Sequence, residues 1–508
     1  MVAPKKWSSK MILLGIGASV LLAGCSSNGS EKPQNVTNGS GSTGELKPYE
    51  IVMMFPFNNQ PKELQVVTEE INRITKEKMN ATVKLVPISF GTWAQQTTVM
   101  LAGNEKIDLM YSSVRGSFNN TVALGHFIPL DELIAKYGQN AKKALDEQNP
   151  QILNATKVNG KIYGLPNIKD LASDYGVTMR KDLVEKYKID INSIKTLDDL
   201  DAIFKMIKDN EPGVTPTVKY GSTIIDSYVG SLIDPLGNQF GVLPIHGNEL
   251  KVVNWFETKE YENLLKTVRR WYLAGYIAKD AATDTETKYN LVKAGRGFSW
   301  LSSMKPGIEQ QETRSTGKEM VSVRLSPPIT TTDKITGSSW SIVRSSENPE
   351  RAMMLLDLLY TNKDLQNLFS WGVEGKHYVK KGDVIDFPEG VNASNSGYNL
   401  QQGYMFGNQF LSYIWNGDDP QLWDKMSKFN KSAVISRAIG FSFNAEPVKT
   451  EIAAANNVIN QFRVALETGM LDPESKLPEF NKQLKAAGLD KIIAEKQKQL
   501  DEWAKSNK

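Results

Sequence analysis

The chain has little cysteine and little histidine for its length. One cysteine, Cys25, occurs in 508 residues, and the three histidines, His126, His246 and His377, lie far apart. A single cysteine cannot form an intramolecular disulfide or a CxxC metal site. The histidines also lack the HExxH spacing of zinc enzymes. The sequence therefore predicts no bound metal and no cofactor.

Motifs for covalent chemistry are missing as well. The sequence has no GxSxG nucleophile elbow and no Walker A loop. A glycosidase needs only two carboxylates on either side of a sugar, and Asp418-Asp419 beside Trp415 is the nearest candidate pair. A capped turn or a calcium-friendly surface loop accounts for these two acids more simply. We therefore expect the protein not to be an enzyme.

The chain carries no large excess of charge of either sign. It has 60 Lys and Arg against 57 Asp and Glu, which gives a net charge of +3 at pH 7. Three of the lysines, Lys5, Lys6 and Lys10, lie in the first 24 residues, so the remainder is formally neutral. A nucleic-acid-binding protein needs a basic patch or stripe. We therefore expect no nucleic-acid partner.

The only pronounced apolar run is Met11–Leu22, and it is too short to span a bilayer, which takes about 20 residues. It follows the three lysines and ends in Leu22-Ala23-Gly24-Cys25, which matches the lipobox of bacterial lipoproteins. We interpret residues 1–24 as a lipoprotein signal peptide and Cys25 as the lipidated residue. Residues 25–47 are polar and rich in Gly and Ser, which predicts a flexible linker. The body is then expected on the extracytoplasmic face of the cell membrane, attached by its lipid.

The rest of the chain is long enough for two lobes, because single cores rarely exceed about 250–300 residues. Its first part alternates strands and helices. Glu50–Phe55, Ala81–Val86 and Ile107–Tyr111 are predicted strands, with an amphipathic helix after Pro61 and another between Thr92 and Gly103. This order predicts a parallel α/β sheet, in which ligands meet the carboxyl ends of the strands.

Polar and aromatic residues follow each of these predicted strands. The segments are Pro56–Gln60, Pro87–Trp93 and Ser112–Arg115, which are rich in amides, hydroxyls and rings. Rings can cover the C–H faces of sugars while amides replace water on their hydroxyls. The pattern favours a neutral polyhydroxylated ligand, although Asn, Ser and Gly also populate turns regardless of function.

The stretch Asn159–Lys188 contains two extended segments on either side of a polar bend, followed by the charged helical sequence RKDLVEKY. It resembles the first crossing between the lobes of extracellular solute-binding proteins of ABC importers, family 1, carbohydrate type. The resemblance implies a two-lobe, periplasmic-binding-protein-like type II α/β fold with hinge crossings. We predict the first lobe from residues 48–165 and 285–330, and the second from 166–284 and 331–370.

Further segments carry the same resemblance, among them FPFNNQPKELQ, MLAGNEKIDLM and WGVEGKHY. The last of these opens a region similar to the C-terminal extension of Gram-positive lipoproteins of this family. We expect residues 371–508 to form a helical extension packed on the second lobe.

The resemblance implies capture of a carbohydrate, an oligosaccharide in particular, and its delivery to the permease subunits of an ABC importer. The predicted ligand-binding residues are Phe57, Asn58, Asn59, Trp93, Ser112, Ser113, Asp170, Asp174, Tyr175, Lys305, Trp340, Trp371 and Trp415. Two alternatives remain. One is a peptide or amino-acid binder, in which Arg115 and Lys305 would take the carboxylate. The other is a sensor that presents its ligand to a receptor kinase.

Overall fold

The computed structural model describes residues 46–57, 60–112, 118–247, 249–400 and 402–506. Cys25, Asn58, Asn59, Ser113 and Arg115, which the sequence singled out, lie outside these ranges. None of the helices in the described part of the chain is long and apolar enough to cross a membrane. The described residues from Lys47 onward build two main sheets, of five and four strands, each with its own apolar core, together with four smaller sheets of two or three strands.

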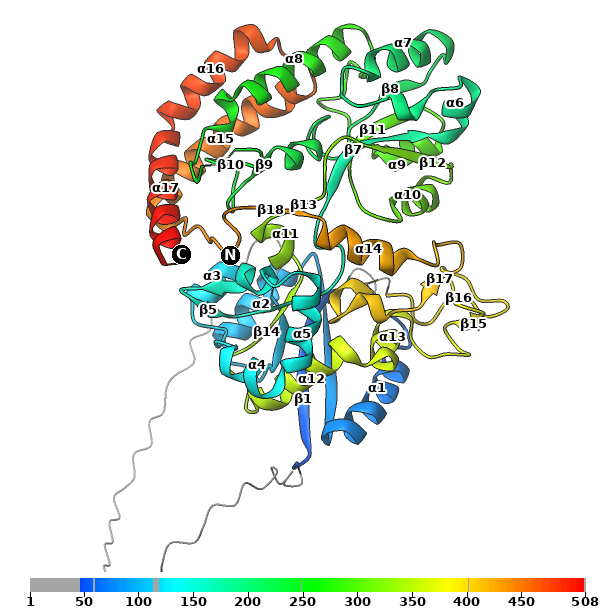
Figure 1. Ribbon diagram of the computed structural model, residues 1–508, viewed down its shortest axis with the longest axis vertical. Coiled ribbons are helices and arrows are strands. Elements are labelled where there is room, and N and C mark those ends of the chain that lie inside the picture. The colour runs from blue at the N-terminus through cyan, green and yellow to red at the C-terminus, as the bar shows by residue number, and fades with distance from the viewer. Residues whose placement is uncertain (1–45, 58–59, 113–117, 248, 401, 507–508) are drawn as a thin grey trace, which may run out of the picture. The chain divides into compact units, whose positions relative to one another are not determined.

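The first sheet has five strands in the order β2-β1-β3-β14-β6 (Figure 1). Their bounds are Ala81–Ser89 for β2, Tyr49–Phe57 for β1, Leu109–Tyr111 for β3, Ser339–Ile342 for β14 and Leu165–Pro166 for β6. β1 pairs in parallel with both β2 and β3, as the alternating strand and helix order predicts. β14 then runs antiparallel to β3 and β6.

Helices cover this first sheet and complete the first lobe. They are α1 (Leu64–Met79), α2 (Trp93–Ala102), α3 (Phe118–Ala123), α4 (Asp131–Tyr137), α5 (Gln139–Gln148), α12 (Pro349–Thr361) and α13 (Lys363–Trp371). The turn η1 (Ile152–Thr156) leads into the hairpin β4 (Lys157–Val158) and β5 (Lys161–Ile162). The stripe that predicted α1 is buried at Val67, Ile71 and Ile74. α12 begins where the sequence predicted, because the Asn348 side chain accepts a hydrogen bond from Arg351 N and Pro349 fills the first turn.

The second sheet has four strands in the order β12-β7-β11-β8. They are β12 (Met320–Arg324), β7 (Asp174–Arg180), β11 (Gly297–Met304) and β8 (Thr215–Thr217). The surrounding elements are α6 (Lys181–Lys186), α7 (Leu200–Asn210), α8 (Lys259–Leu273), α9 (Lys288–Lys293), α10 (Ile308–Thr316) and the pair β9 (Ile233–Asp234) and β10 (Leu243–Pro244). Together they form the second lobe.

This topology corrects the predicted division of the chain. Residues 285–330 do not return to the first lobe, because β11 pairs antiparallel with β7 and β12 pairs with the other edge of β7. Residues 331–370 do not join the second lobe, because β14 lies in the first sheet and α12 packs into the first core. The sequence therefore predicted each of these two ranges in the wrong lobe: 285–330 belongs to the second lobe and 331–370 to the first.

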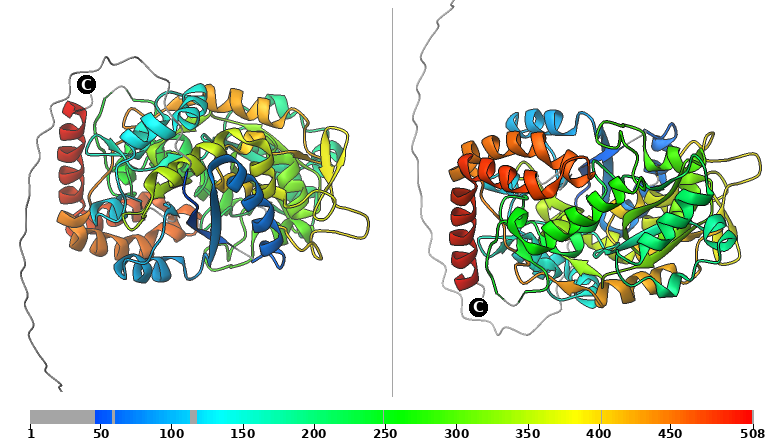
Figure 2. Two further views of the ribbon diagram at one scale, coloured as in Figure 1. Left: turned by 90° about the horizontal axis from the view of Figure 1, so that it is seen from below. Right: turned by 90° about the horizontal axis from the view of Figure 1, so that it is seen from above.

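The C-terminal region is divided between both lobes, so the prediction that it packs only on the second lobe is wrong. Tyr398, Leu400, Met405 and Phe406 belong to the first core. The helices α15 (Lys449–Glu467), α16 (Pro473–Ala486) and α17 (Leu489–Ser506) belong to the second core. α15 and α16 lie beside α8, and α17 packs on α15 and α16 at one end of the molecule (Figures 1 and 2). A small sheet of β15 (Val379–Lys381), β16 (Val384–Asp386) and β17 (Ile414–Trp415) projects from the first lobe.

Three segments connect the lobes. The first runs from β6 to β7, the second from β12 through β13 (Ile329–Thr330) and α11 (Thr332–Thr336) to β14, and the third from α14 (Leu422–Lys431) through β18 (Val434–Ile435) to α15. β13 pairs with β18, and Ser173 bridges to Ile329, so the three segments lie side by side.

A buried lysine fastens the last helix to the second lobe. The Lys496 side chain in α17 is fully buried, and its ammonium donates to the carbonyl oxygens of Gly241 at 2.7 Å, Asn238 at 3.1 Å and Pro235 at 3.2 Å, and to Asn238 Oδ1 at 3.0 Å. All four acceptor atoms lie in the loop between β9 and β10. The lysine therefore holds this loop against α17.

We expect Lys496→Met to lower the free energy of unfolding by about 2–4 kcal/mol, because it leaves these buried acceptors without a donor. Urea denaturation followed by circular dichroism measures the change. Lys498→Met, two residues further on α17 and 64% exposed, is the matched control and should change stability by less than about 0.5 kcal/mol. Equal effects of the two variants would contradict this role of Lys496.

Candidate functional site

The candidate site lies where the two sheets face their connecting segments. β1 and β3 are parallel, so their carboxyl ends, Phe57 and Tyr111, lie at one edge of the first sheet. In the second sheet Asp174, the first residue of β7, is paired with Met304, the last residue of β11. The first connecting segment joins these two edges. Ligands of α/β sheets bind at such strand ends.

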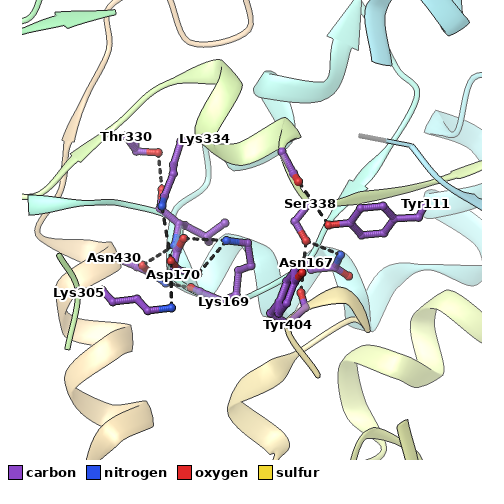
Figure 3. Close-up of polar contacts among 12 residues, drawn as sticks. Tyr111, Asn167, Lys169, Asp170, Lys305, Thr330, Lys334, Ser338, Tyr404 and Asn430 are labelled. Atoms are coloured by element: carbon purple, nitrogen blue, oxygen red, sulfur yellow. Dashed lines mark hydrogen bonds and ion pairs between the residues drawn. The ribbon is translucent and has the colours of Figure 1, made fainter. Parts of the chain in front are cut away.

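Polar contacts hold the first-lobe side of this site together (Figure 3). Asn167 Nδ2 donates to Ser338 Oγ at 3.0 Å, and Ser338 Oγ donates to the backbone oxygen of Tyr404 at 3.3 Å. Gln402 Nε2 donates to the carbonyl of Pro56, near the end of β1, at 3.1 Å. The segment around Tyr404 therefore lies against both the first connecting segment and the end of β1.

A cluster of charges occupies the middle of the site (Figure 3). The Asp170 carboxylate lies 2.8 Å from Lys169 Nζ, 3.4 Å from Lys305 Nζ and 3.5 Å from Lys334 Nζ. Asp170 and Lys169 belong to the first connecting segment, Lys305 follows β11, and Lys334 lies in α11. We call these four residues the Asp170 cluster. It joins the first and second connections to the end of a second-lobe strand.

The electrostatics of the Asp170 cluster are set by burial and by its three ammonium groups. Burial alone would raise the pKa of Asp170, but the charges of Lys169, Lys334 and Lys305 outweigh it and hold the pKa well below its usual value. Burial lowers the pKa of Lys334 to about 8 in spite of Asp170. Lys169 and Lys305 lower the pKa of Lys334 further by repulsion. The cluster therefore has more positive charge than Asp170 can balance.

A second ion pair lies at the start of β7. Arg324 contacts the buried carboxylate of Asp174 at 3.3 Å and donates to Glu309 at 2.7 Å. Burial raises the pKa of Asp174 to about 6, against the opposing effect of Arg324. Tyr175, the next residue, is half-buried, and its hydroxyl lies against Gly230. Asp170, Asp174, Tyr175 and Lys305 are thus the predicted residues that the structure brings together.

Three other predicted ligand residues are buried inside the first lobe. Trp340 is fully buried, stacks edge-on against Tyr111 and donates from Nε1 to the carbonyl of Met405. Trp93 is 2% exposed and belongs to the same core. Ser112 is 1% exposed, and its hydroxyl donates to the backbone of Ser339. In this structure all three side chains are buried in contacts within the first lobe, so contact with a ligand remains a prediction for them.

Trp371 and Trp415 pack against each other. Their ring centroids are 5.2 Å apart, and Trp415 also contacts the ring of Phe387 at 4.6 Å. Trp371 Nε1 donates to the carbonyl of Tyr413. The two rings pack α13 against the small sheet β15-β16-β17, beside the first lobe (Figure 1). Of the remaining predicted residues, Phe57 is half-buried at the end of β1, whereas Asn58, Asn59 and Ser113 lie outside the described residues.

Two tyrosines at the site escaped the sequence reasoning. Tyr404 lies at the first-lobe side, with Lys169 Nζ 6.0 Å from its ring centre. Tyr220 follows β8, is 37% exposed and rests on Lys288 Nζ at 3.9 Å from its ring centre. Lys288 in turn pairs with buried Glu312 at 3.3 Å. Tyr220 follows a strand of the second sheet, but β8 has only three residues, which are too few to form a periodic pattern in the sequence.

A large groove lies on the opposite face of α11. Its volume is about 2550 Å³, and it runs between α3, η1 and the β4-β5 hairpin on one side and α17 with the third connecting segment on the other. Asp333 and Thr336 of α11 line this groove, whereas Lys334 turns toward Asp170. The second connection therefore separates the groove from the Asp170 cluster.

The acids at 418 and 419 serve structural contacts. Asp418 pairs with Arg314 of α10 and thereby joins the first lobe to the second. Asp419 accepts from Gln421 N at 2.9 Å and pairs with Lys425, as a turn cap does. Within the described ranges no three His, Cys, Asp or Glu side chains are grouped so that they could hold a metal ion.

Comparison with known proteins adds two family matches. The model described as bacterial extracellular solute-binding protein matches residues 58–366, more than half of the chain. A domain of unknown function matches residues 437–505, which include α15, α16 and all of α17 but its last residue.

Three relatives illustrate the likeness. A carbohydrate ABC transporter substrate-binding protein of Streptococcus pneumoniae serotype 4 is 29% identical over 484 residues, covering 93% of this chain and 95% of the relative. Lipoprotein LipO of Bacillus subtilis is 25% identical over 413 residues, 77% and 76% of the two chains. The crystal structure of the N-glycan transport solute binding protein NgtS from Streptococcus pneumoniae is 28% identical, with a TM-score of 0.80 over 91% of this chain and 100% of that one. Its complex with Man1GlcNAc gives a TM-score of 0.70 at the same identity, over 90% and 100% of the chains.

We expect Asp170→Asn to lower the free energy of unfolding at pH 7 by about 2–4 kcal/mol, because it leaves three ammonium groups without their carboxylate. The depressed pKa of Asp170 means that its contribution is present above its unfolded pKa of about 4 and is lost as the pH falls below that value. Urea denaturation at pH 7, 5 and 3 should therefore show the difference between wild type and variant shrinking only toward pH 3.

Asp209→Asn is the control for this prediction, because Asp209 forms an exposed pair with Lys205 on α7. Surface pairs contribute about 0–1 kcal/mol, so this variant should stay close to wild type at every pH. A destabilisation by Asp170→Asn that does not change between pH 7 and pH 3 would contradict the assigned ionisation.

Proposed function

The chain belongs to the bacterial extracellular solute-binding proteins, and from that premise we propose that it captures an oligosaccharide between its two lobes and delivers it to the permease of an ABC importer. The observation that carries this proposal is the meeting of strand ends from both sheets with the connecting segments, around the Asp170 cluster. The relatives support a glycan over a peptide or amino acid, since one is a carbohydrate transporter protein and another has been solved with Man1GlcNAc.

The mechanism needs no covalent step, and we propose that the protein has no catalytic activity. The lobes exchange between open and closed arrangements about their three connections. A ligand that contacts both lobes stabilises the closed arrangement in proportion to its higher affinity for it. The permease then distinguishes the closed from the open form. Lys305 and Tyr220 stand at the second-lobe side of such a ligand, whereas Tyr404 and Phe57 stand at the first-lobe side.

We propose Tyr220 as a stacking surface for a sugar ring. It is the most exposed ring at the site, and Lys288 below it fixes its orientation. Asn58, Asn59 and Ser113 remain proposed contacts, on the ground that they follow β1 and β3. A lipid on Cys25 would attach the body to the outer face of the cell membrane, in keeping with the lipoprotein LipO among the relatives.

The first experiment is a thermal-shift screen of residues 47–508 against oligosaccharides, including oligomannose N-glycan fragments, together with amino acids and short peptides. A ligand that binds only the folded state raises the melting temperature through mass action. A shift with glycans alone supports the proposal. A shift with peptides alone would refute the proposal that the ligand is a glycan. No shift with any compound would refute the proposed capture of a ligand.

For a glycan found in that screen, we expect Tyr220→Ala to weaken binding by roughly 1–3 kcal/mol, the scale of a lost stacked ring. Isothermal titration calorimetry measures the affinity. Tyr137→Ala is the matched control, because Tyr137 is 38% exposed at the end of α4, on the first lobe. An affinity of the Tyr220 variant equal to that of the control would remove Tyr220 from the site.

For the anchor, we expect Cys25→Ser to move the protein from the membrane fraction to the culture supernatant or the soluble fraction of a bacterial host. The serine hydroxyl cannot form the thioether that lipidation requires. Immunoblotting of separated fractions measures the distribution, with the unchanged chain as the reference. A variant that stays with the membrane after washing in high salt would contradict a lipid at Cys25.

A further inference from the structure

The Asp170 cluster contains three ammonium groups and one carboxylate. The side chains of Lys305 and Lys334 are 32% and 29% exposed, whereas those of Lys169 and Asp170 are 13% and 15% exposed. Two of the three cations are thus the most accessible members of the cluster. They reach the site from different elements, Lys305 from the end of β11 and Lys334 from α11.

Asp170 binds these two accessible lysines only loosely. Its contact with Lys169 is 2.8 Å, the length of a charge-assisted hydrogen bond, but those with Lys305 and Lys334 are 3.4 and 3.5 Å. An ammonium has three donors that all favour closer acceptors. Both lysines therefore have room for a nearer negative group.

The neighbouring carboxylates form their ion pairs with other cations, and Lys305 acts on Glu312 only as the last of the causes that shift the pKa of Glu312. Arg324 forms ion pairs with Asp174 at 3.3 Å and with Glu309 at 2.7 Å. Lys288 forms an ion pair with Glu312 at 3.3 Å. Arg324 and Lys288 bring the cations around the site to five, and Asp174, Glu309 and Glu312 bring the carboxylates to four. The excess positive charge lies on the accessible side, at Lys305 and Lys334.

One further acid is close to Lys334 in the sequence. Asp333 is its neighbour on α11, but it lines the groove on the opposite face of that helix. Asp170 is therefore the carboxylate that offsets the repulsion of Lys334 by Lys169 and Lys305, and it is shared among all three lysines.

We propose that the glycan captured here carries a carboxylate, as uronic and sialic acids do, and that this carboxylate binds Lys305 and Lys334. The inference rests on the proposed function and narrows its ligand class. A sugar carboxylate would supply the missing negative charge and two oxygen acceptors, one for each ammonium. It would also link the second lobe to α11, so that it favours the closed arrangement. The remaining sugar units would contact the rings and amides around it.

The test compares pairs of sugars that share a neutral part, one of them carrying a carboxylate. Lactose is paired with 3′-sialyllactose, and cellobiose with cellobiouronic acid. Affinities are measured by isothermal titration calorimetry on residues 47–508 at low salt and in 0.5 M NaCl. We expect the carboxylated member of at least one pair to bind about 10- to 100-fold more tightly at low salt, the range of a charged hydrogen bond. The preference should shrink in high salt, because screening weakens partly exposed charges.

Lys305→Gln and Lys334→Gln should each bring the ratio of the two affinities close to one. Lys482→Gln, an exposed lysine on α16, is the control and should leave the ratio unchanged. Thermal unfolding of each variant checks that it folds, and two variants keep the test open if one of them does not.

The outcomes separate this inference from the proposed function. If the neutral and carboxylated sugars of each pair bind equally, or the neutral one binds more tightly, the proposal of a carboxylated ligand is refuted, whereas the proposed capture of a glycan is not. A preference that survives in both lysine variants refutes their role. If no sugar in these pairs or in the wider screen binds, both the proposed function and this inference fail.

Discussion

A shared carboxylate sets the geometry at the centre of this protein. Asp170 stands on the first connecting segment and contacts ammonium groups from three places in the sequence, of which only Lys169 is its neighbour. A buried charge is costly unless it is paired, so this arrangement fixes how the connecting segments lie beside one another. Replacing Asp170 would therefore remove the carboxylate from its contacts with all three lysines at once. The position of the strand ends, and hence of the candidate site, follows from this constraint.

Much of the first lobe could be predicted from the sequence. The alternation of apolar runs with amphipathic stretches gave β1, α1, β2, α2 and β3 in the right order, and the Asn348-Pro349 pair marked the start of α12. These features depend on neighbours along the chain, which the sequence contains directly. The first connecting segment was recognised for the same reason, since Pro166 and the alternating residues up to Met179 form a local pattern.

The exchange of residues 285–330 and 331–370 between the lobes shows what local patterns leave open. Each segment contains a short apolar run that forms a buried strand, β11 in one and β14 in the other, and local sequence does not decide which sheet the strand joins. The choice depends on pairing partners more than a hundred residues away, such as Ser299 with Met179. Trp340 shows the same limit for a side chain. Its small polar neighbours resembled a binding loop, but the ring fills the space between Tyr111 and Phe406. Tyr220 and Tyr404 could not be chosen, because their exposure depends on how the lobes pack.

The composition of the second core sets the order in which the chain can fold. That core combines Val177 and Phe298 with residues from α15 to α17, as far as Ile492. A chain made from its N-terminus therefore cannot complete the second core before α15, α16 and the start of α17 have been synthesised. The first sheet likewise waits for β14 at Ser339. Such long-range contacts form slowly. A polypeptide whose two cores close only through such distant contacts has more time to pass an export channel before it folds.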